Sequence, residues 1–181
     1  MMKWRGVERD MEQEKPLQRR RRAPSFTLKD KSGRKIALKD CREPYVVLFF
    51  YPKDNTPGCT IEAKEFSKLK ASFSRAGARV LGVSGGDESS KQKFCARHNI
   101  TVTLLSDPDF SVAKKYGVFG QKRFMGREYF GIARTTFVLG PDRSILHVFE
   151  NVKPLGHARE VLAWIQQHRK EGEDRQAKKR S

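Results

Sequence analysis

An unbroken run of apolar and aromatic residues, 45–51, is followed by a proline and then by a helix-like pattern, and this order limits the fold more than any other feature. A strand without a polar face is typical of a sheet that is covered on both sides. Pro52 ends the strand because proline cannot donate to a sheet ladder. Downstream, apolar residues recur at near-helical spacing, at Ile61, Phe66, Leu69 and Phe73. We therefore expect a buried strand, a turn at Pro57-Gly58, and a helix.

Cys59 stands in the first turn of that expected helix. The unpaired N–H groups and the positive end of the helix dipole would surround its sulfur there. Such surroundings favour the thiolate form of a cysteine, which is the form that attacks other molecules. A lone cysteine elsewhere is usually an inert, small apolar residue. The sequence therefore indicates a reactive thiol at this position.

The remaining pattern alternates strands and helices and ends in a hairpin and a helix. The expected elements are a short hairpin at about 25–38, strand 45–51, helix 58–75, strand 78–84, helix 88–98, strand 102–105, helix 109–116, a basic loop 120–131, a hairpin of 134–139 with 145–150, and a final helix with Leu155, Ala158, Leu162 and Ile165 on one face. This alternation predicts a three-layer α/β sandwich.

The composition excludes several classes of protein. A chain of 181 residues has room for one domain and tails. Its three cysteines are too scattered for a disulfide scaffold and lack the paired spacing of zinc or haem sites, so no metal and no cofactor is expected. No apolar stretch reaches the roughly 18 residues of a membrane span, and no signal peptide is evident. We expect a cytoplasmic protein without a membrane partner, or a nuclear one in a eukaryote.

The net charge of +17 is spread over the whole chain. Residues 1–22 carry eight basic and four acidic residues, and residues 166–181 carry six and three. Four consecutive arginines, 19–22, are open to three interpretations: a nuclear-import signal, a nucleic-acid contact, or a solvated tail. Basic proteins bind nucleic acid without sequence preference through counterion release. We expect both tails to be disordered.

The residues around Cys59 follow the pattern Pro-x-x-x-Thr-x-x-Cys, from Pro52 through Thr56, which resembles the peroxidatic motif of peroxiredoxins. The longer stretch 50–63 is similar to the bacterioferritin comigratory protein, or peroxiredoxin Q, branch of that family. Further similar segments follow in family order at 23–28, 104–108 and 131–138.

This resemblance covers residues 23–168. It implies a thioredoxin-like fold with an N-terminal β-hairpin for that segment, flanked by a basic tail at 1–22 and a charged tail at 169–181.

The resemblance also implies roles for individual residues. Cys59 would attack the O–O bond of a hydroperoxide and become a sulfenic acid, with release of water or an alcohol. Arg134 would lie beside Cys59 and donate to the peroxide, since its guanidinium stays charged and offers several donors. Thr56 would share its hydroxyl between the sulfur and the peroxide, and Pro52 would shield the sulfur from water. Glu62 would orient Arg134 from the same helix as Cys59.

The reduction of the sulfenic acid needs a second thiol. Many members of the branch carry a resolving cysteine five residues after the peroxidatic one, where this chain has Lys64. Others place it in the next helix, and Cys95, 36 residues after Cys59, resembles that arrangement. Cys95 is therefore the resolving candidate, with simple core packing as the alternative. Cys41 is expected to be a bystander, and resolution by it is a minor alternative.

Two hypotheses of function follow. The first is a monomeric thiol peroxidase that reduces hydrogen peroxide and organic hydroperoxides and is recycled by thioredoxin or a glutaredoxin-like dithiol donor. The second is a non-catalytic basic protein on a thioredoxin-like scaffold, which associates with nucleic acid or senses redox state. The first requires Cys59 for turnover, whereas the second predicts salt-sensitive binding that is indifferent to Cys59.

Overall fold

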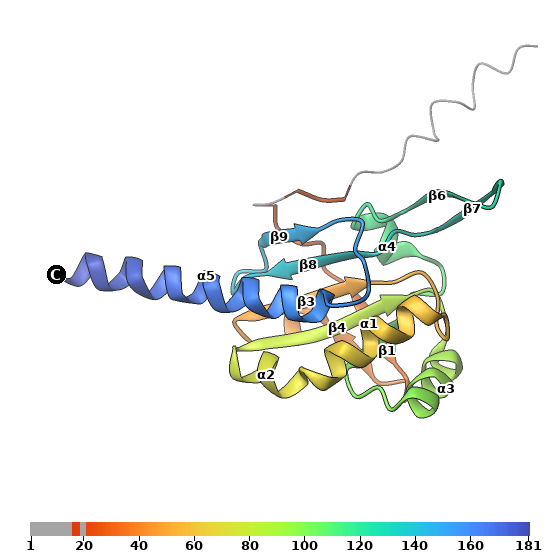
Figure 1. Cartoon of the computed structure of the whole chain (residues 1–181), viewed down its shortest axis with the longest axis horizontal. Helices are drawn as coiled ribbons and strands as arrows, with labels where there is room; N and C mark the ends of the chain where they lie inside the picture. The colour runs from red at the N-terminus through yellow and green to blue at the C-terminus, as the bar shows by residue number, and fades with distance from the viewer. Residues whose placement is uncertain (1–15, 19–20) are drawn as a thin grey trace, which may run out of the picture.

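The computed structural model describes residues 16–18 and 21–181, so most of the basic N-terminal tail, with its expected disorder, lies outside the described residues. The elements, in chain order, are β1 (Thr27–Asp30), β2 (Lys35–Ala37), η1 (Leu38–Asp40), β3 (Tyr45–Phe50), α1 (Pro57–Lys68), α2 (Lys70–Arg75), β4 (Ala78–Ser84), α3 (Glu88–His98), β5 (Thr103–Ser106), α4 (Ser111–Lys115), β6 (Phe119–Phe124), β7 (Arg127–Ile132), β8 (Thr135–Leu139), β9 (Ile145–Phe149) and α5 (His157–Arg180). Figure 1 shows their arrangement.

A seven-stranded mixed sheet forms the centre of the molecule, in the order β2-β1-β5-β4-β3-β8-β9. The central strand β3 runs parallel to β4 and antiparallel to β8. β1 and β2 form the expected N-terminal hairpin, and β8 and β9 form the expected later one. The C-terminal end of β3 therefore lies between β4 and β8, and both strands hold in place the point where the next loop begins.

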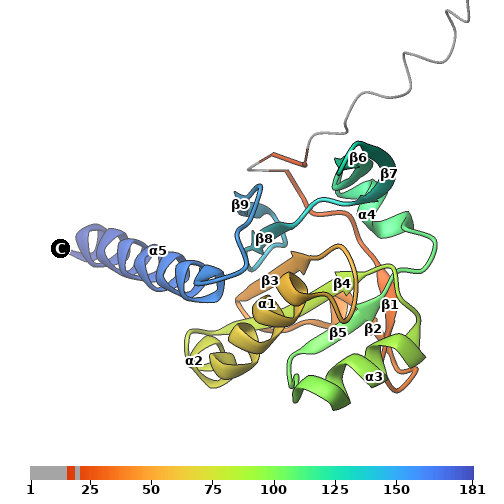
Figure 2. The same ribbon diagram turned by 45° about the vertical axis from the view of Figure 1, so that its right-hand side comes forward.

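Alternate residues of β3 enter two separate hydrophobic clusters. Val47 and Phe49 belong to the cluster that also contains side chains of α1, α2, α3 and α5. Val46 and Leu48 belong to the cluster on the opposite face, which is completed by α4 and η1. Figure 2 shows α1 and α2 packed along one side of the sheet. The arrangement confirms the predicted three-layer α/β sandwich, because both faces of β3 are buried.

The helix that the sequence predicts over 58–75 is divided in two. Leu69 ends α1 and precedes α2, with φ −94° and ψ 5°. Its N–H still bonds to the carbonyl of Glu65 at 3.1 Å. The apolar spacing of Phe66 and Phe73 continues across the break, since both side chains enter the same cluster. A periodicity argument therefore could not detect the division.

The prediction of a basic loop over 120–131 is wrong. These residues form a two-stranded antiparallel sheet of β6 and β7, paired from Phe119 with Ile132 to Phe124 with Arg127. The turn residues Met125 and Gly126 both have positive φ, which suits the right-handed twist of a two-residue hairpin. The hairpin projects from the body (Figure 1). Most of its side chains are exposed on both faces, so it lacks the apolar alternation that marks a strand in a sequence.

The expected disorder of the C-terminal tail is also wrong. α5 continues to Arg180 and extends beyond the body of the molecule (Figure 1). Its buried residues end at Ile165, and His168 and Arg169 still contact Tyr45 and the carbonyl of Arg75. Beyond them, the helix is supported by its own backbone bonds and by pairs such as Glu171–Arg175. Leu155, expected on the apolar face, precedes this helix and is 78% exposed.

The described part of the N-terminal tail contacts the body. Arg22 forms an isolated bridge with Ser144, and the N–H of Ile145 donates to the carbonyl of Arg21 at 2.8 Å. Expected disorder is therefore wrong for these two arginines. Among the described residues, none of the helices has the length and apolar character that a bilayer crossing requires.

Candidate active site

Cys59 is the third residue of α1, as the sequence predicts. The helix begins at Pro57, and Thr56 is its N-cap with extended φ and ψ. The sulfur side chain is only 1% exposed and carries no disulfide. A thiol at this place faces the free N–H groups of the first helical turn. The local sequence thus places the cysteine at the positive end of a helix, below the surface.

Arg134 connects Cys59 to a buried carboxylate. Its Nη2 donates to Sγ of Cys59 at 3.4 Å, and its Nη1 donates to Oε2 of Glu62 at 2.5 Å. Burial alone lowers the pKa of Arg134, but the charges of Glu62 and Cys59 outweigh it and raise that pKa above its usual value. The guanidinium is therefore a permanent cation beside the sulfur. Residues 75 positions apart in the chain meet here, as predicted.

Gly58 makes room for this arrangement. A Cβ atom at this position would lie 3.1 Å from Nη2 of Arg134 and 3.2 Å from Cγ of Pro154. The backbone of Arg134 is held from the other side, since its carbonyl accepts from the N–H of Val152 at 3.2 Å. The glycine of the Pro-Gly turn thus permits close approach of the guanidinium to the helix start, in addition to forming the turn.

Glu62 is fully buried, and only one of its carboxylate oxygens is satisfied. Oε2 accepts from Arg134, whereas Oε1 has no hydrogen-bond partner among the described protein groups. Burial raises the pKa of Glu62 to about 7, against the lowering effect of the Arg134 charge. The charge of this side chain is therefore sensitive to pH near neutrality.

Thr56 and Pro52 lie in the loop that precedes Cys59. The hydroxyl of Thr56 donates to the carbonyl of Lys53 at 2.9 Å rather than to the sulfur. The carbonyl of Thr56 accepts from the N–H and the hydroxyl of Thr60, at 2.9 and 2.7 Å. Pro52 is exposed. The roles expected for Thr56 and Pro52 remain predictions.

Cys95 and Cys41 are both reduced and buried. Cys95 lies on α3 and belongs to the same hydrophobic cluster as Cys59, whereas Cys41 belongs to the cluster on the opposite face of the sheet. Burial raises the pKa of both thiols. Cys95 therefore lies on the same side of the sheet as Cys59, and Cys41 lies on the opposite side.

A buried polar network beside the Cys59 loop was not predicted. Asp54 accepts from the hydroxyls of Tyr51 at 2.6 Å, Ser90 at 2.6 Å and Ser84 at 3.2 Å, and from Nζ of Lys91 at 2.9 Å. A signal existed in the sequence: Lys91 lies at helical spacing from two apolar residues of α3, on the face that enters the core.

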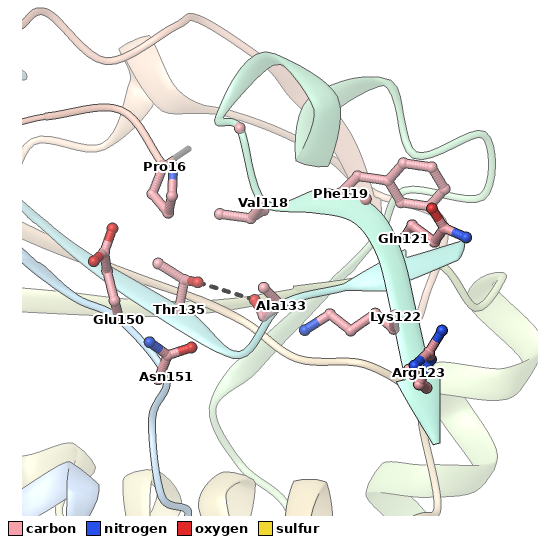
Figure 3. A pocket seen from close by; sticks show the side chains of 12 residues that line it. Pro16, Val118, Phe119, Gln121, Lys122, Arg123, Ala133, Thr135, Glu150 and Asn151 are labelled. Carbon is pink, nitrogen blue, oxygen red and sulfur yellow. Dashed lines mark hydrogen bonds between the residues drawn. The ribbon is translucent and has the colours of Figure 1, made fainter. Parts of the chain in front are cut away.

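A cavity of about 500 Å³ lies next to Arg134, lined by strand β6, by the neighbours of Arg134 in the chain and by the two residues that follow β9. Figure 3 shows the ammonium of Lys122 pointing into it from β6. Burial and then the charge of Arg134 lower the pKa of Lys122. The β6–β7 hairpin thus adds positive charge near the candidate site. The sulfur of Cys59 does not line this cavity.

Comparison with known proteins agrees with this geometry. The AhpC/TSA family matches residues 20–148. The peroxiredoxin bcp of Helicobacter pylori J99 is 46% identical over 140 residues, which are 77% of this chain and 92% of that protein. Peroxiredoxin Bcp of Escherichia coli K12 is 38% identical over 146 residues, which are 81% and 94%.

Solved structures are similar in the same way. The bacterioferritin comigratory protein of Xanthomonas campestris, whose structures address its alkyl peroxide reduction activity, has a TM-score of 0.74 and 35% identity and covers 79% of this chain and 91% of its own. Structures of peroxiredoxin Q from the same organism include two cysteine-to-serine mutants, and the mutated positions are 36 residues apart. The predicted thioredoxin-like fold is confirmed by these similarities.

Proposed function

Since the chain belongs to the AhpC/TSA family and is a thiol-dependent peroxidase of the peroxiredoxin Bcp type, we propose that Cys59 is the residue that attacks the peroxide. The contact between Arg134 and the sulfur carries this proposal. A cation at 3.4 Å stabilises a thiolate, and the start of a helix adds unpaired N–H donors.

The proposed reaction is a displacement at oxygen. The Cys59 thiolate attacks one oxygen of the O–O bond, the S–O bond forms, and the O–O bond breaks. The other oxygen leaves as hydroxide or alkoxide and takes a proton to become water or an alcohol. Arg134 stabilises the negative charge that develops on the leaving oxygen, because its guanidinium is already fixed beside the sulfur.

Glu62, Thr56 and Pro52 are proposed as supporting residues. Glu62 holds one edge of the guanidinium, so that the remaining donors face the sulfur. Thr56 fixes the first turn of the helix through its carbonyl, and rotation of its hydroxyl would bring it toward a bound peroxide. Pro52, in the same loop, would limit access of water to the sulfur.

Cys95 is proposed as the resolving cysteine. Its separation of 36 residues from Cys59 equals the separation of the two cysteines mutated in the Xanthomonas campestris protein. Cys59 and Cys95 are buried on different helices, and we propose that the first turn of α1 unwinds when the disulfide between them forms. The disulfide would then be reduced by thioredoxin or a glutaredoxin-like dithiol donor.

The substrates proposed are hydrogen peroxide and organic hydroperoxides, including alkyl hydroperoxides by analogy with the Xanthomonas campestris protein. We also propose that the enzyme acts as a monomer in the cytoplasm, where dithiol donors are kept reduced. Membership in a peroxidase family argues against the non-catalytic alternative. Contact of the basic tails with nucleic acid is compatible with peroxidase activity.

Stopped-flow peroxide reduction tests the assignment, with mass spectrometry of the quenched enzyme. Cys59→Ser is expected to abolish turnover while the fold is kept. Cys95→Ser is expected to react once with peroxide and to retain a sulfenic acid on Cys59. Cys41→Ser serves as the matched control and should resemble the wild type. Peroxide consumption by Cys59→Ser would refute the proposal for the attacking residue.

A further inference from the structure

Lys91 is a charged residue in a place where cores are normally apolar. It is 0% exposed, and its three ammonium protons are all used. Nζ donates to Oδ2 of Asp54 at 2.9 Å, to the hydroxyl of Ser84 at 2.7 Å and to the carbonyl of Gly86 at 3.2 Å. Space for this packing is kept by Gly86, where a Cβ atom would lie 2.3 Å from Asp54 Oδ2. In this structure, the charge of the ammonium is therefore balanced by Asp54, and each of its protons has an acceptor.

The stability of the fold does not explain such a pair. Removing two charges from water costs several kcal/mol per ion, and well-packed apolar residues often stabilise a protein as much or more. α3 already has Phe94 in the core as an apolar anchor. The positive charge of Lys91 therefore points to a role other than stabilising the fold.

The ion pair joins the two segments that carry the cysteines of the proposed reaction. Asp54 lies in the loop between β3 and Cys59, and Lys91 lies on α3, four residues before Cys95. Residues four apart share one face of a helix. A second contact joins the same segments farther along, since Nε2 of His98 lies 3.1 Å from Oδ1 of Asn55. The Cys59 loop is thus held along α3 on both sides of Cys95.

Opening of that loop would separate the two charges. The proposed Cys59–Cys95 disulfide involves unwinding of the first turn of α1, and Asp54 lies only five residues before Cys59. In the proposed opening, Asp54 would leave Ser84, Ser90 and Lys91 together with the loop, whereas Lys91 would stay on α3 with Cys95. The ammonium loses its carboxylate partner at the moment when Cys95 has to react.

We propose that Lys91 is a positioning residue for the resolving step: its charge is neutralised by Asp54 while the loop is closed, and favours the thiolate of Cys95 once the loop has opened. This inference rests on the proposed role of Cys95. Cys95 thiolate attacks the sulfur of the Cys59 sulfenic acid, the S–S bond forms, the S–O bond breaks, and hydroxide leaves and takes a proton to become water.

The groups that face Cys95 agree with this assignment. Burial raises the pKa of the Cys95 thiol, Lys31 and Lys91 lower it, and Asp54 raises it. Lys31 lies in the turn between β1 and β2, outside the loop that opens, so its influence does not depend on the loop. Asp54 and Lys91 are the two of these groups whose relative positions change when the loop opens.

The test is the rate of sulfenic acid loss after one equivalent of hydrogen peroxide, followed from pH 5 to 9 by quenching and mass spectrometry. Lys91→Met is expected to form the disulfide three to ten times more slowly at pH 7 and to shift the midpoint of the pH profile upward by up to about one unit. Lys93→Met is the matched control, because it removes an exposed lysine from the same helix. It should follow the wild-type profile.

Two further variants separate charge from folding. The double variant Asp54→Asn with Lys91→Met leaves no unpaired buried charge, and it should show the same slow resolution and raised midpoint. Asp54→Asn alone leaves the ammonium uncompensated in the closed state, so iodoacetamide should alkylate Cys95 faster in the reduced protein than in the wild type.

A wild-type midpoint in both the single and the double Lys91 variants would overturn the proposal. Failure of Cys95→Ser to prolong the sulfenic acid would instead refute the role of Cys95 itself, so the two failures are distinguishable.

Discussion

Arg134 divides its hydrogen bonds between two partners of different chemistry. One nitrogen faces the sulfur that is proposed to react, and the other faces a carboxylate that holds the guanidinium in place. A lysine could supply the charge but not both directed donors, because its ammonium is a single point. At the scale of residues, the site therefore depends on the planar fork of one arginine as well as on its charge.

Arg134→Lys is expected to lower the second-order rate with hydrogen peroxide by about 10²- to 10³-fold, the usual cost of losing an oriented donor. Stopped-flow rates at pH 7 measure the effect. Arg123→Lys on the exposed β6–β7 hairpin is the control, since its ion pair with Glu128 is on the surface. Equal rates for Arg134→Lys and the wild type would contradict the role given to the guanidinium.

Glu62→Gln tests the buried carboxyl. Because burial raises the pKa of Glu62 from its ordinary 4.5 to about 7, its contribution to stability is fully present below pH 4.5 and is lost as the pH rises through 7. The loss amounts to about 3 kcal/mol. Urea unfolding from pH 4 to 8 should show that decline in the wild type and a flatter curve in the variant. Glu173→Gln on exposed α5 should keep the wild-type curve.

At the scale of elements, the start of α1 combines a strand end, a turn and a helix terminus in a few residues. Gly58 is placed where its missing side chain matters most, against Arg134 and Pro154. Alanine is a better helix former than glycine by roughly 1 kcal/mol, so a helix alone would favour alanine there. The glycine at this position indicates that room for the guanidinium beside the helix start matters more than the helix propensity that alanine would add.

Gly58→Ala is therefore expected to displace Arg134 and to lower the peroxide rate more than tenfold, while the melting temperature changes little. Gly172→Ala is its control, because a Cβ atom there meets nothing within 4 Å. That substitution should stabilise α5 by about 1 kcal/mol and leave the rate unchanged. Circular dichroism melting and stopped-flow rates of both variants decide the matter; an unimpaired Gly58→Ala enzyme would contradict the argument.

Elements with strong periodicity could be predicted from the sequence, and the others could not. Strand 78–84 and helix 88–98 have the bounds that the sequence predicts, since the strand is an apolar run buried on both faces and the helix buries one face. The β6–β7 hairpin buries little and looks like a loop. Within the site, the motif leads to Cys59, and the family resemblance leads to Glu62 and Arg134. The pair of Asp54 and Lys91 escaped because the helical spacing of Lys91 marks a buried position but does not identify its partner 37 residues away.

At the scale of the whole molecule, the positive charge extends beyond the enzyme body. The distal part of α5 carries six basic residues against three acidic ones within 169–181, and the helix holds them away from the sheet (Figure 1). No described residue of α5 beyond Ile165 is buried. This segment therefore suits a polyanion better than it suits the core.

Deletion of residues 169–181 is expected to leave peroxide reduction and the melting temperature nearly unchanged, because the segment contributes no buried side chain to the core. Affinity for duplex DNA should fall, and so should the slope of its dependence on salt concentration, as phosphate contacts are lost. Fluorescence anisotropy with labelled duplex at 50 to 200 mM salt measures both. An unchanged salt slope would assign any DNA binding to the rest of the surface.

The reach of α5 also affects how the molecule moves through solvent. The eleven residues after Arg169, the last described one that contacts the body, extend the helix by about 16 Å, at 1.5 Å per residue. A globule that carries such a rod has a larger Stokes radius than a sphere of 20.8 kDa. A monomer would elute early from a gel-filtration column and resemble a dimer there. Sedimentation equilibrium, which responds to mass and not to friction, would report the true number of chains.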